Sequence, residues 1–97
     1  MTFEDFRNCV SEANPPAVAP ALLALWHDAR GHWDKAHTVA QDVEDETGAW
    51  VHAYLHRKEG DLSNAAYWYR RAKQRVATDS LEAEWVRIVT TLLAHSE

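Results

Sequence analysis

The residues with the most evident chemistry are histidines near the middle of the chain. The sequence holds six histidines, and His52 and His56 lie four positions apart. On a helix this spacing puts both rings on one face, with Glu59 on the same arc. Imidazole and carboxylate groups so arranged can bind zinc or a similar metal ion. An internal similarity of the chain places His27 at the position equivalent to His56, so the metal candidates are His27, His52 and His56.

A structural explanation of the same histidines competes with the metal site. The H-x-x-x-H spacing is common in helices, the HExxH motif of zinc hydrolases is absent, and structural zinc normally needs four ligands. A half-buried imidazole that bonds to Asn64, Tyr69 or a carboxylate satisfies the pattern equally well. We therefore expect structural histidines, no bound metal and no cofactor.

No set of residues has the pattern of a catalytic site. Cys9 lies far in sequence from any histidine, and Ser63 and Ser80 stand where helices are expected to begin. The histidines, Tyr54 and Glu59 offer acid–base groups, but nothing nearby fixes a substrate. We expect no catalytic residues and a protein that is not an enzyme.

Composition restricts the possible partners and the compartment. The 97 residues suffice for one domain, and the net charge of −5 argues against general nucleic-acid binding. The single cysteine cannot form an internal disulfide, which favours a reducing compartment. The acidic N-terminal segment is not a signal peptide, and no apolar run approaches the roughly 18 residues of a membrane span. We expect a cytoplasmic protein without a membrane partner.

The spacing of apolar residues predicts helices throughout and no strands. Thr2, Asp61 and Asp79 are the expected N-terminal caps, and Gly31 and Gly60 the expected turns. The predicted helices cover residues of about 3–13, 20–30, 33–44, 49–59, 62–75 and 80–95, with Thr47 and Gly48 as the break between the third and the fourth. The acidic run 42–46 then ends the third helix, which opposes the helix dipole, so a basic segment is expected beside it. The candidate is the cluster at the end of the fifth helix, Arg70, Arg71, Lys73 and Arg75.

Shifting the chain by 29 residues superimposes it on itself. Leu22 then falls on Val51, and Gly31 falls on Gly60. Each unit is a helix, a glycine turn and a second helix, so the sequence predicts units at about 20–46 and 49–75. The remaining segments, about 3–13 and 80–95, are the expected capping helices of one all-α domain spanning residues 1–97.

The second unit resembles the tetratricopeptide repeat. The matching small and aromatic positions of this family are Gly60, Ala65, Tyr69 and Ala72, and the first unit matches through Gly31, Ala36 and Val43. The period of 29 is shorter than the family's roughly 34 residues, and the proline that usually follows the second helix is missing. The chain is also similar to small bacterial proteins of this type.

The resemblance implies a concave face that binds a protein or peptide. The family's groove positions carry over to Trp50, Tyr54, Arg57 and Lys58 in the second unit and include Asp28 in the first. Aromatic residues and arginine dominate interface energies, and the two cations favour an acidic partner. In an equally weighted alternative, the first or sixth helix covers Trp50 and Tyr54. A homo-oligomer formed through the same surface is a further alternative.

Two functions from different classes therefore follow from the sequence. The first is a protein- or peptide-binding helical-repeat module without catalysis. The alternative is a small-molecule or metal-binding protein, catalytic or not, that uses His27, His52 and His56. His37 falls on the outer helix of the first unit and is assigned no role.

Overall fold

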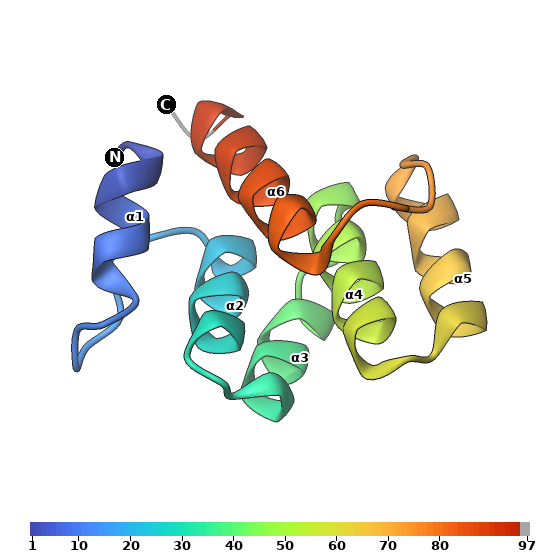
Figure 1. The fold of residues 1–97 in the computed structure, drawn as a ribbon, viewed down its shortest axis with the longest axis horizontal. Helices are drawn as coiled ribbons and strands as arrows, with labels where there is room; N and C mark the ends of the chain where they lie inside the picture. Colours follow the sequence, from blue (N-terminus) through green and yellow to red (C-terminus); the bar gives the residue numbers. More distant parts are fainter. Residues whose placement is uncertain (96–97) are drawn as a thin grey trace.

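The computed structural model describes residues 1–95, which form an all-helical fold without strands in that range (Figure 1). The helices are α1 (Phe3–Cys9), α2 (Pro20–Ala29), α3 (Trp33–Gln41), α4 (Glu46–Glu59), α5 (Leu62–Ala72) and α6 (Leu81–His95). The prediction of an all-α protein with about six helices is confirmed. None of these helices has both the length and the apolar character needed to cross a membrane.

Local side-chain chemistry begins several of these helices as expected. Thr2 and Asp5 form a capping box at the start of α1, each side chain bonding to the other's backbone N–H. The Asp61 side chain accepts from the Asn64 N–H and caps α5. Gly60 ends α4 with a φ of +92°, a left-handed conformation that costs least at glycine.

The predicted break at residues 47–48 is wrong, because α4 already begins at Glu46. The Asp45 side chain accepts a 3.0 Å hydrogen bond from the Gly48 N–H and thereby caps α4. Gly48 is a helical residue here, and a Cβ on it would overlap the Val43 carbonyl oxygen. Asp45 and Glu46 thus lie at a helix N-terminus, where acidic groups are favourable, and not at a C-terminus.

Four other helix ends also differ from the prediction, and one of them is the end of α3, at Gln41 instead of about residue 44. The first helix ends at Cys9, and α5 ends at Ala72 because Lys73 adopts a left-handed φ of 58°. Ser80, not Asp79, caps α6, since its hydroxyl accepts from the Ala83 N–H at 3.0 Å. Asp79 forms an ion pair with Arg87 instead.

Four of the helices pack as two pairs, and α6 packs across these pairs. The pairs are α2 with α3 and α4 with α5, and the pairs meet where α3 contacts α4. Figure 1 shows α6 between α1 and α4, and it contacts α2 as well. The core therefore includes residues from α2, α4 and α6: Leu22, Leu25, Val51, Leu55, Ile88 and Val89.

Three of the five tryptophans tie one element to another through their indole N–H groups. Trp26 on α2 donates to the Cys9 carbonyl at 2.8 Å. Trp33 on α3 donates to the Leu55 carbonyl of α4 at 2.9 Å, and Trp85 on α6 donates to the Leu25 carbonyl of α2 at 3.2 Å. Each ring thus buries apolar area while its polar edge is satisfied, which fixes how neighbouring helices meet.

Candidate functional site

The aromatic residues of the predicted binding face are buried. Trp50 is 6% exposed and Tyr54 is 3% exposed. Trp50 lines a shallow hollow with residues 73–79 and Arg87, and Tyr54 lies beside Trp85 of α6 in the wall of a groove. The structure thus has the arrangement given as the alternative, in which α6 and the segment leading to it cover this part of α4.

Asp28 and Lys58, which the repeat alignment placed on one face, do come together with Tyr54. Asp28 is only 2% exposed, and its two carboxylate oxygens accept from the Lys58 ammonium at 3.0 Å and the Tyr54 hydroxyl at 3.2 Å. Burial, and then the nearby Asp28 charge, raise the pKa of the Tyr54 phenol. The phenol therefore stays protonated and donates to the carboxylate, while Lys58 remains partly exposed at the rim.

Arg57 has a different role from the expected one. Its guanidinium donates to the Glu84 carboxylate of α6 at 2.8 Å and also to the Asp79 carbonyl. Glu84 in turn accepts from the Tyr69 hydroxyl of α5 at 2.6 Å. The guanidinium is thus occupied by internal acceptors, so a two-pronged grip on an outside carboxylate would require breaking these contacts.

A groove of about 500 Å³ opens between α1, α2, α4 and α6. Three of the predicted binding residues line it, namely Asp28, Tyr54 and Lys58, whereas Trp50 and Arg57 do not. The remaining wall comes largely from α1 and α6 and includes Phe3, Arg7, Val10, Leu81, Glu82, Trp85 and Val86. The sequence indicated part of this site, but the contribution of the two terminal helices was missed.

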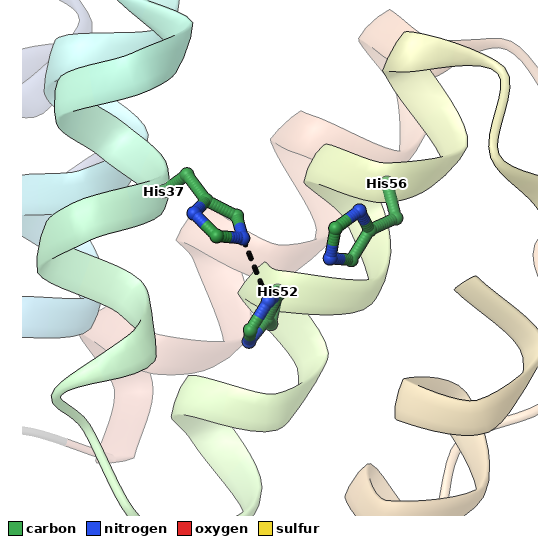
Figure 2. Close-up of side chains that lie close together, drawn as sticks. All are labelled: His37, His52 and His56. Atoms are coloured by element: carbon green, nitrogen blue, oxygen red, sulfur yellow. Dashed lines mark hydrogen bonds between the residues drawn. The ribbon is translucent and has the colours of Figure 1, made fainter. Parts of the chain in front are cut away.

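The histidines form a second site, between α3 and α4. Figure 2 shows His37 from α3 facing His52 and His56 from α4. The Nε2 atoms of His37 and His52 are 2.9 Å apart, and the rings of His52 and His56 stack with centroids 4.7 Å apart. His52 also stacks on Trp68 of α5 at 3.9 Å.

His27, the third histidine expected here, lies elsewhere, and His37 takes its place. The His27 ring packs edge-on against Trp26 at 5.0 Å, and its Nδ1 is buried without a hydrogen-bond partner in the described structure. His37 was missed because its helix was expected to face outward. A signal was present, since His37 follows Trp33 by one helical turn and stacks on it.

The environment of the cluster favours the neutral form of His37 and His52. Burial, and then the neighbouring His37 and His56, lower the pKa of His52 to about 4. Burial, and then the neighbouring His56, also lower the pKa of His37. The Nδ1 atom of His56 is 2.6 Å from a Glu59 carboxylate oxygen. At neutral pH, His37 and His52 therefore present uncharged nitrogen atoms, the form in which imidazole binds metals.

Comparisons of the chain with protein-family models, with curated proteins and with solved structures found no match.

Proposed function

We propose that the protein is a short helical-repeat module of the tetratricopeptide type that binds a peptide segment of another protein. The observation that supports this most directly is the groove between α1, α2, α4 and α6. Its volume of about 500 Å³ lies within the range of ligand pockets. The two helical pairs, α2–α3 and α4–α5, each with a glycine turn, supply the repeated scaffold of the proposal.

The groove lining favours an apolar segment that carries an acidic group. Phe3, Leu81 and Trp85 offer apolar surface from α1 and α6. Arg7 is exposed and has no ion-pair partner within residues 1–95, so its charge is available to a ligand. Such an exposed guanidinium can accept a carboxylate in bidentate geometry.

Three polar residues of the groove, Asp28, Tyr54 and Lys58, are bonded to one another. Lys58 neutralises Asp28, so this carboxylate does not repel an acidic ligand, and the Tyr54 hydroxyl fixes the same carboxylate from the other side. Glu82 is the remaining acid of the lining and lies on α6. A peptide that places its carboxylate toward Arg7 and its apolar side chain toward Trp85 matches this distribution. The single cysteine fits a cytoplasmic location for such a module.

Selection from a random peptide library on the purified full-length protein tests the proposal. The selected peptides are expected to combine an apolar side chain with an aspartate or glutamate. Their affinity should fall at least tenfold in Arg7→Glu, because attraction becomes repulsion, on the order of the 1.5–3 kcal/mol of a charged hydrogen bond. Isothermal titration calorimetry measures this change.

Arg70→Glu is the matched control for that charge reversal. Arg70 is an exposed arginine on α5 and lines none of the described cavities. It should leave the affinity unchanged. Equal losses of affinity in Arg7→Glu and Arg70→Glu would show that the peptides bind through general charge attraction and not in the groove. Failure to select any peptide would contradict the proposed function. Concentration-dependent self-association lost in Arg7→Glu would instead make a second copy of the chain the occupant.

A further inference from the structure

We propose that His37, His52 and His56 form a binding site for a divalent transition-metal ion such as zinc. One nitrogen atom from each of these residues lies within 4.8 Å of the other two. Two ligands come from α4, one turn apart, and the third comes from α3 across the interface (Figure 2). The proposed ion therefore joins the two helical pairs at the point where they meet.

The spacing of the nitrogen atoms is close to that of a tetrahedral zinc site. Zinc–nitrogen bonds of about 2.0–2.1 Å place ligand atoms roughly 3.3 Å apart. The Nε2 atoms of His37 and His52 are already 2.9 Å apart, and no separation within the cluster exceeds 4.8 Å. Small rotations of the imidazole rings, whose terminal torsions have broad minima, bring the three nitrogens to bonding distance. Without metal, these two Nε2 atoms lie at hydrogen-bond distance, one as donor and the other as acceptor.

Glu59 orients His56 in the way expected of a metal ligand. The 2.6 Å contact of its carboxylate with Nδ1 fixes the proton on that nitrogen and leaves Nε2 with its lone pair. The Asn64 amide is 3.4 Å from this Nε2, which is a long contact that a metal bond would replace. Glu59 is therefore a positioning residue, not a ligand.

An acidic hollow reaches the cluster at His52. His52 lines this hollow of about 850 Å³ together with Glu44, Asp45 and Glu46, from the segment between α3 and α4 and the start of α4. A concentration of carboxylates along a hollow raises the local concentration of cations. Arg71 is the opposing charge in the same lining and packs over Trp68 at 5.0 Å. Three histidines leave one coordination position for water from this side, as in zinc sites with three protein ligands.

The ligand set determines the class of metal. Three imidazoles and no carboxylate suit zinc, cobalt, nickel or copper, whereas magnesium and calcium require oxygen ligands. All the coordinating groups belong to one chain, so the expected stoichiometry is one ion per protein.

Titration of the untagged, metal-free full chain with zinc, in competition with a chromophoric chelator, tests the site. We expect one ion per chain and at least a hundredfold loss of affinity in His37→Ala. Glu59→Gln should weaken binding about tenfold, at the lower end of effects from groups that orient a ligand. His32→Ala is the matched control, because His32 is exposed and outside the cluster, and it should change nothing.

A measurement on the wild-type protein avoids dependence on the stability of the variants. In long-range nitrogen–proton spectra, added zinc should shift the imidazole signals of His37, His52 and His56 together, with those of His32 and His95 unmoved. Substoichiometric binding, or shifts at other histidines, would overturn the proposal. So would unchanged affinity in His37→Ala with loss in Asp61→Ala, because His56, Glu59 and Asp61 form the other close cluster of possible ligands among the described residues.

Discussion

Glu84 is a fully buried carboxylate that connects α4, α5 and α6. Its two oxygens accept from the Arg57 guanidinium and from the Tyr69 hydroxyl. Burial, followed by the hydrogen bond to Glu84, raises the pKa of Tyr69, so the hydroxyl remains a donor. A paired buried charge contributes little net stability, but removing one member leaves the other desolvated and uncompensated. The network therefore fixes where α6 docks.

Glu84→Ala should reduce the free energy of unfolding by about 3–5 kcal/mol, because Arg57 then remains with a cavity in place of its carboxylate. Urea denaturation followed by circular dichroism measures this loss. Glu82→Ala, two residues earlier on the exposed side of α6, should change stability by at most about 0.5 kcal/mol. Similar stability of the two variants would show that Glu84 does not hold α6 in place.

The sequence predicted Arg57 as a binding residue, but it did not identify Glu84 as the partner of this arginine. Glu84 falls among the apolar positions of its helix, four residues before Ile88, which is also buried. An acid in an apolar stripe indicates a buried partner, yet the spacing alone does not say which of the basic residues supplies it. That choice depends on how α6 crosses α4 and α5, which no local pattern encodes.

Gly48 was predicted to break the chain between two helices, but it is a helical residue of α4. It lies inside the first turns of α4, in contact with the backbone at Val43, and the sequence suggested only its helix-breaking property. The need for a residue without Cβ comes from the tight connection between α3 and α4. By contrast, Thr2 and Asp61 were assigned correctly as caps, because capping depends on three or four consecutive residues.

Gly48→Ala should destabilise the protein by about 1–3 kcal/mol, the range typical of overpacking. The same substitution in an open helix would stabilise it by up to about 1 kcal/mol, so the sign itself is diagnostic. The midpoint of thermal unfolding, compared between Gly48→Ala and the parent protein, gives this sign. A Gly48→Ala variant as stable as the parent would show that residues 43–48 do not approach as closely as described.

At the scale of the whole molecule, the helical class follows from the 3.6-residue periodicity, but the position of α6 does not. Helix α6 packs across the helical pairs. Its position determines which of the predicted binding residues are covered and which line the groove. Trp50 is buried for this reason, whereas Lys58 remains at the rim. Likewise, the histidine cluster required knowledge that α3 packs on α4.

The basic cluster at the end of α5 shows the same dependence on packing. The sequence placed it beside the acidic run, which was expected to end the third helix. In the structure, Lys73 does form a 3.0 Å ion pair with Glu46, but Glu46 belongs to α4. Both groups are largely exposed, so the pair contributes at most about 1 kcal/mol. One acid of the run therefore pairs with the cluster, and it does so from the start of α4, not from the end of α3.

The most direct test of the peptide-binding account is the indole region of a nitrogen–proton correlation spectrum, recorded while a selected peptide is added to the wild-type protein. Trp85 lines the groove between α1 and α6, whereas Trp33 lies at the α3–α4 interface with its N–H bonded to Leu55. The account predicts a saturable shift of the Trp85 indole signal and an unmoved Trp33 signal. A shift of Trp33 with Trp85 unchanged would contradict it.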